Sequence, residues 1–171
     1  MTTERGEGDV SCQRVLPDAL GGEPPLACHH LHLEPLPRLV ADARRFVVEH
    51  APTLPPETYD ILLLATSELV TNAVLHARTE IEVGITVAEH TVLVTVHDLD
   101  LTRPQQRPYD GREGGWGLGL VGSMTEASAL EVHPGGGKTA WFRVARGAPR
   151  VVRDDVASRL EPADLDEEAT A

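Results

Sequence analysis

The chain has 171 residues, a length that suits one domain with terminal extensions, and its formal net charge is −12. This acidic balance argues against broad nucleic-acid binding and against docking on anionic lipid, because both depend on basic surface. No apolar run is long enough to span a bilayer, and the first nine residues contain no apolar signal core. We therefore expect a soluble, cytoplasmic protein with no direct contact to nucleic acid or membrane.

Composition divides the chain into three parts. Residues 1–25 combine glycine, proline and scattered charge, and we expect a flexible N-terminal arm there. Residues 26–146 carry the periodic apolar patterns of one ordered domain. Residues 147–171 are polar and acidic, and we expect a mostly flexible tail. Cys12 and Cys28 form no CxxC pair, so neither a disulfide framework nor a zinc site is expected.

Apolar periodicity predicts the elements of the ordered domain. In chain order they are a strand at 26–34, helices at 36–50 and 56–76, strands at 79–87 and 91–98, a helix at 117–126, and strands at 128–133 and 138–145. The loop at 99–116 is longer than a compact domain usually keeps without a purpose. Helices set among hairpin-connected strands predict an α/β fold, a two-layer α/β sandwich whose sheet is mixed but mostly antiparallel, with helices on one face.

Three polar residues interrupt the apolar helix at 56–76. Glu68, Asn72 and His76 follow one another at a spacing of four, which places them on one face of a helix. Since buried polar groups need partners, this stripe is expected to face a polar ligand or a metal. Asn72 offers a carbonyl oxygen suited to Mg²⁺, and Glu68 can accept a proton during phosphoryl transfer. The alternative is a solvated helix edge with an i,i+4 hydrogen bond.

Asp98 ends the buried-looking strand at 91–98. A carboxylate there can accept a hydrogen bond from the exocyclic amine of adenine, whereas the corresponding position of guanine is itself an acceptor. The alternative is an aspartate that opens a turn and caps the backbone.

Glycines cluster where the long loop meets the helix at 117–126. Gly115, Gly117 and Gly119 allow the backbone to approach a ligand, and the first turn of a helix favours phosphate. No Gly-Lys-Ser/Thr follows, which excludes a Walker A loop, and no strand directly precedes, which argues against a Rossmann fingerprint. The alternative is a hinge without a ligand.

Taken together, these segments resemble the GHKL (Bergerat-fold) ATPase superfamily. Residues 67–77, SELVTNAVLHA, are similar to its N-box, and Asp98 is similar to the acidic residue of the next box. Residues 115–121, GWGLGLV, resemble the glycine box that follows the ATP lid, and residues 137–142, GKTAWF, resemble the terminal strand. The order and spacing agree over about residues 28–145. The closest resemblance is to small, free-standing anti-sigma-factor serine-protein kinases.

The resemblance implies a homodimer that binds a sigma factor and transfers the γ-phosphate of ATP to a serine of an antagonist protein. It implies that Glu68 is the catalytic base, that Asn72 holds Mg²⁺, and that Asp98 and Thr139 contact adenine. It also implies that residues 99–114 are the ATP lid, although Asp100 and Thr102 stand where many members have glycine. The residues expected at the nucleotide are Asn72, His76, Asp98, Gly115, Gly117, Leu118, Gly119 and Thr139.

Two other functions fit the same segments. One is a non-catalytic ATP-binding regulator whose nucleotide state controls partner binding. The other is a histidine-kinase catalytic domain that works in trans with a separate phosphoacceptor.

Overall fold

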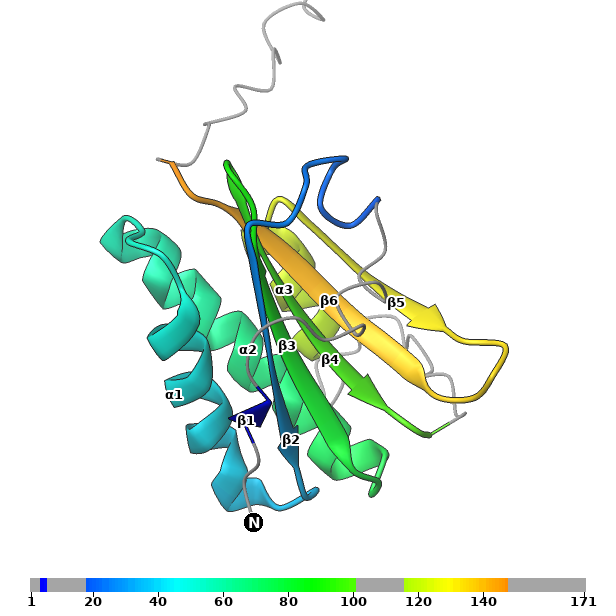
Figure 1. Cartoon of the computed structure of the whole chain (residues 1–171). Coiled ribbons are helices and arrows are strands. Elements are labelled where there is room, and N and C mark those ends of the chain that lie inside the picture. The colour runs from blue at the N-terminus through cyan, green and yellow to red at the C-terminus, as the bar shows by residue number, and fades with distance from the viewer. Residues whose placement is uncertain (1–3, 6–17, 101–115, 148–171) are drawn as a thin grey trace, which may run out of the picture.

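The computed structural model describes residues 4–5, 18–100 and 116–147, and these form the layers shown in Figure 1. The elements are β1 (Glu4–Arg5), β2 (Ala27–Leu33), α1 (Val40–His50), α2 (Pro56–His76), β3 (Ile81–Val87), β4 (Thr91–Asp98), α3 (Trp116–Met124), β5 (Ala127–Val132) and β6 (Lys138–Ala145). A single 3-10 turn, Pro37–Leu39, leads into α1. The predicted order of strands and helices is confirmed, and β1 is an additional short strand that periodicity does not predict.

The strands form one sheet in the order β1-β2-β3-β4-β6-β5. Every neighbouring pair in the described part of this sheet is antiparallel, so the expectation of a mixed sheet is wrong in that respect. The reason lies in the connection between β2 and β3. Leu33, at the end of β2, pairs with Ile81, at the start of β3. The chain therefore leaves and re-enters the sheet at the same end, and the two strands must run in opposite directions.

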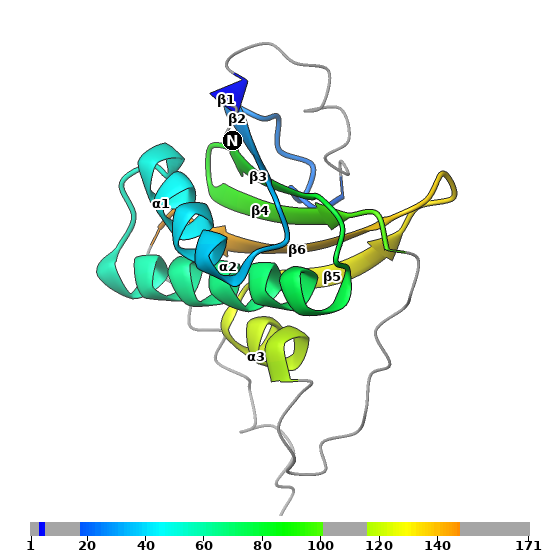
Figure 2. The same cartoon turned by 90° about the horizontal axis from the view of Figure 1, so that it is seen from below.

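The helices cover one face of the sheet, as expected for a two-layer α/β fold (Figure 2). α2 contacts α1 and α3 on either side and β3, β4 and β6 beneath it. Along β4, Val92, Val94 and Val96 alternate toward the helices and are at most 2% exposed. They meet the buried face of α2, which includes Leu62 and Leu69. No helix in the described ranges is long and apolar enough to cross a membrane.

A second, smaller core lies on the opposite face of the sheet, which we call the outer face. Ala19 and Leu20 are buried there against Leu93 and Trp141. Part of the segment expected to be a flexible arm therefore packs on the sheet. Both residues are small or apolar and are followed by a turn at Gly21, whose φ of 67° suits glycine. The boundaries of the domain at residues 26 and 146 remain a prediction.

Leu20→Ala tests this packing. We expect the free energy of unfolding to fall by about 2 kcal/mol, because the substitution leaves a cavity beside Leu93 and Trp141. Chemical denaturation measures the change. Leu26→Ala is the control, since Leu26 is 64% exposed and should change stability by less than about 0.5 kcal/mol. Equal stability of Leu20→Ala and wild type would show that the segment does not pack in solution.

Cys28, on β2, is disulfide-bonded, which contradicts the expectation of no disulfide. The other cysteine of the sequence, Cys12, lies outside the described residues. Cysteine spacing shows local motifs but does not reveal which distant cysteines meet in a fold, and this explains the error.

Candidate functional site

Glu68 and Asn72 lie on one flank of α2. The opposite flank is marked by Tyr59, whose hydroxyl donates to the carbonyl of Pro52 in the α1–α2 connection at 2.9 Å. Glu68 follows Tyr59 by nine residues, which is about two and a half helical turns, so the two side chains point to opposite sides. α1 and α3 both contact α2, on different sides of it (Figure 2). Helical geometry thus places Glu68 and Asn72 on the flank of α2 away from Tyr59.

These side chains are partly buried, yet they have no polar partner among the residues that the structure describes. The i,i+4 hydrogen bond that the alternative interpretation requires does not join Glu68 to Asn72 in this part of the chain. Both groups are only partly enclosed, so they remain open to water or to a ligand. A ligand that offers a cation and polar oxygens would satisfy both groups. His76, at the end of α2, is exposed and is less enclosed than the other two.

Asp98 lies at the end of β4 on the face that the helices cover. It continues the alternation of Val94 and Val96 and is only 3% exposed. Its Oδ1 accepts a hydrogen bond from the backbone N–H of Asp100 at 2.9 Å, and the Nζ of Lys138 lies 3.4 Å from the same oxygen. Burial raises the pKa of the Asp98 carboxyl above its usual value, while the Asp100 amide and Lys138 act in the opposite direction.

The two interpretations of Asp98 are compatible, because they use different oxygens. Oδ1 caps the turn through Asp100, as the alternative interpretation predicts. No interaction of Oδ2 is found with the described residues. This oxygen is therefore the acceptor that the carboxylate can offer to a donor from outside the protein.

The turn after α2 brings the helix stripe and Asp98 to the same end of the sheet. α2 ends at His76, and β3 begins at Ile81, which pairs directly with Asp98. The hydroxyl of Thr79, within this turn, accepts a hydrogen bond from the backbone N–H of Leu99 at 3.1 Å. The end of β4 is thereby tied to the end of α2. Asn72 lies about one turn, and Glu68 about two turns, before the end of the same helix.

α3 supplies the third part of the arrangement. Gly117, Leu118 and Gly119 lie in its first turns, and α3 contacts both α2 and β5. Gly119 is exposed, and a Cβ at this position would meet no atom of the described residues within 4 Å. The first turns of a helix favour an anion, and no described side chain would block one at Gly119. Gly115 and the expected lid beyond Asp100 lie outside the described residues.

Thr139 is not brought together with Asp98. In β6, Lys138 pairs with Asp98 and Thr139 pairs with His97, and successive side chains of a strand point to opposite faces. The Thr139 hydroxyl is bonded on the outer face to His97 Nδ1 at 3.1 Å and to His133 Nε2 at 2.7 Å. The expectation that Thr139 contacts adenine is therefore corrected, because its hydroxyl lies on the outer face of the sheet. The side chain beside Asp98 is Lys138, which motif matching alone did not assign to the site.

Thr139→Val tests this placement. We expect the dissociation constant for Mg-ADP to stay within about twofold of wild type, because the hydroxyl lies on the face away from Asp98. Calorimetric titration measures the change. A large loss of affinity for Mg-ADP in the variant would show that Thr139 contacts adenine, as the family resemblance implies.

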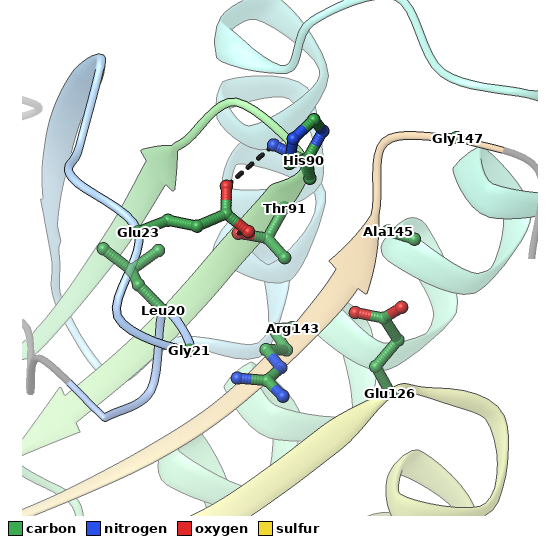
Figure 3. Close-up of a pocket in the computed structure, with 9 residues that line it drawn as sticks. All are labelled: Leu20, Gly21, Glu23, His90, Thr91, Glu126, Arg143, Ala145 and Gly147. Carbon is green, nitrogen blue, oxygen red and sulfur yellow. Dashed lines mark hydrogen bonds between the residues drawn. The ribbon is translucent and has the colours of Figure 1, made fainter. Parts of the chain in front are cut away.

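A pocket of about 460 Å³ lies elsewhere, at the other end of β4 and β6 on the outer face (Figure 3). Its lining contains none of the predicted site residues. It combines Arg143 with the carboxylates of Glu23 and Glu126, and Glu23 already accepts a hydrogen bond from the backbone N–H of His90 at 2.8 Å. Two carboxylates beside one arginine disfavour a phosphate-bearing ligand, so this pocket is not a candidate for the same chemistry.

Comparison with known proteins identifies the family to which this domain belongs. The model of the histidine kinase-like ATPase domain family matches residues 33–144, which is most of the chain and includes every described site residue. No curated protein matches the chain significantly. The matched range begins at the end of β2 and ends in β6, so it covers the helices and the strands that position Glu68, Asn72 and Asp98. The chain belongs to the histidine kinase-like ATPase domain family, within the GHKL-type ATPases.

Proposed function

We propose that this protein is an ATP-binding regulator, an anti-sigma factor with serine-protein kinase activity that phosphorylates an antagonist protein. Membership of the histidine kinase-like ATPase family supports ATP binding. The observation that carries the kinase proposal is Glu68. This carboxylate lies one helical turn from Asn72, is partly buried, and has no partner among the described residues. A carboxylate that no described residue engages is available to accept a proton.

The chemistry proceeds by transfer of a phosphoryl group between oxygens. The hydroxyl oxygen of the acceptor serine forms a bond to the γ-phosphorus of ATP. The bond between that phosphorus and the β–γ bridging oxygen breaks, and ADP leaves with the electron pair. Glu68 accepts the proton that the serine hydroxyl loses. Asp98 recognises the adenine amine through Oδ2, and the first turns of α3 hold phosphate through backbone N–H groups.

Asn72 fits a role in holding Mg²⁺. Its side-chain carbonyl is a hard oxygen ligand, and the side chain is partly buried without a partner in the described part of the chain. Mg²⁺ prefers one or two protein ligands together with phosphate oxygens and water, so a single asparagine beside a triphosphate suits it. When bound, the ion would neutralise charge on the phosphates. A homodimer and a sigma-factor partner belong to the same proposal and rest on the family resemblance.

Labelled ATP tests the proposal. The purified protein is incubated with [γ-³²P]ATP, Mg²⁺ and candidate antagonist proteins, and label on a serine of the antagonist is measured. We expect transfer to one antagonist and co-purification of a sigma factor when ATP is present. ATP binding without transfer to any antagonist would instead favour the non-catalytic regulator. Label on a histidine of a partner would favour a histidine-kinase domain acting in trans.

A further inference from the structure

Lys138 is the one lysine of the sequence. It is buried beside Asp98, at the part of the candidate site proposed to bind the nucleotide base. Its side chain is 7% exposed. The Nζ donates to Oδ2 of Asp100 at 2.8 Å and lies 3.4 Å from Oδ1 of Asp98. A buried ammonium is expensive unless it is paired. The carboxylates of Asp98, the last residue of β4, and Asp100, two residues later, supply that pairing.

Backbone geometry places Lys138 there. Lys138 is the first residue of β6 and pairs directly with Asp98, so both side chains emerge on the helix-covered face. The preceding residue, Gly137, has a φ of 84°. A Cβ at Gly137 would lie 2.5 Å from the backbone oxygen of Asp98. The close approach of the two strands therefore requires glycine at this position. It also fixes the position of the Lys138 backbone beside Asp98.

The polar groups that the structure places around Asp98 lie at one of its two carboxylate oxygens. Oδ1 meets the Asp100 N–H and Lys138, whereas Oδ2 meets no described group. β3 presents the apolar Ile81 opposite Asp98, and His76 and Arg78 at the end of α2 are exposed. Lys138 and Asp100 are thus the charged groups that act on Asp98 in the described part of the chain. Only Lys138 has the sign that favours an ionised carboxylate in this buried place.

We propose that Lys138 is a positioning residue for base recognition: it holds Oδ1 of Asp98 so that Oδ2 faces the exocyclic amine of the base as an ionised acceptor. This inference rests on the proposed binding of an adenine nucleotide. The ligand that it specifies is a nucleotide whose base presents an amine donor, and the lysine itself acts through Asp98.

Lys138→Met tests the proposal, because methionine keeps the length and the apolar stem but removes the charge. We expect the dissociation constant for Mg-ADP at neutral pH to rise about tenfold, as expected for loss of a charge-assisted contact. The dependence on pH is the decisive readout. Without the ammonium the pKa of Asp98 rises further, so the affinity of the variant should be lost at a higher pH than that of wild type as pH is lowered.

Calorimetric titrations of the full chain with Mg-ADP and Mg-GDP are run over a series of pH values. They measure the dissociation constant at neutral pH and its dependence on pH. Arg45→Met is the matched control, since Arg45 is an exposed cation of α1 that pairs only with Asp42 among the described residues. Lys138→Arg should restore the pH profile of wild type, because it returns the charge. An unchanged profile in Lys138→Met, or tighter binding, would overturn the inference. Failure of wild type to bind Mg-ADP would overturn it together with the proposed function.

Discussion

Asp98→Asn is expected to weaken adenine-nucleotide binding by at least about 100-fold while the chain stays folded. A carboxylate accepts hydrogen bonds on both oxygens, whereas an amide accepts on one and donates on the other. Oδ1 must accept from the Asp100 N–H, so the asparagine carbonyl would turn toward that group. Its NH₂ would then face the adenine amine, and two donors would oppose each other.

Stability separates this loss of binding from unfolding. The pKa of Asp98 is raised by burial, so the fold favours the protonated carboxyl. The stability that this shift contributes is present at low pH and is lost as pH rises through the pKa of the folded state. At neutral pH a neutral asparagine removes the cost of the buried charge, and Lys138 keeps its contact with Asp100. We therefore expect a melting temperature that is not lower than that of wild type.

Calorimetry and thermal unfolding together measure the Asp98→Asn variant. Asp42→Asn is the matched control, because it removes the same charge from the surface of α1 and should leave nucleotide affinity unchanged. Wild-type affinity in Asp98→Asn would remove Asp98 from the site. Loss of the cooperative unfolding transition would mean that its role is structural.

Glu68→Gln is expected to slow phosphoryl transfer by about 10²–10⁴-fold while ATP affinity remains close to that of wild type. Glutamine keeps the shape and polarity of the side chain but cannot accept the serine proton. Because Glu68 has no hydrogen bond or ion pair with the described residues, the substitution breaks no such interaction there.

Single-turnover transfer from labelled ATP to the antagonist measures this effect, and a separate titration measures affinity. Glu57→Gln, in the first turn of the same helix, is the matched control, since Glu57 is exposed at the far end of α2. Equal rates for Glu68→Gln and wild type would mean that Glu68 is not the base. A parallel loss of affinity and rate would indicate that it binds the nucleotide instead.

The elements that surround the site were predictable because their patterns are local. Pro56 and the apolar spacing up to His76 define α2, and its bounds agree with the prediction. The period-two pattern at 91–98 likewise defines β4 and places Asp98 at its end. The family match supports the fold that these elements imply.

Features that depend on register or on distant contacts were not predictable in the same way. A shift of one residue moves a side chain to the other face of a sheet, and this explains why Thr139 was expected where Lys138 lies. Ala19 and Leu20 are too few to produce a periodic pattern, although they pack in the outer core. The role of Gly115 stays a prediction, because it lies outside the described residues.

The central claim is that α2, the end of β4 and the first turns of α3 form one nucleotide site. Amide chemical-shift changes on titration of the isotope-labelled chain with Mg-ADP test it most directly. We predict the largest changes at Asn72, Asp98 and Gly119, with small changes around the outer pocket at Thr91 and Arg143. Changes confined to that outer pocket, or none at Asp98, would contradict the account.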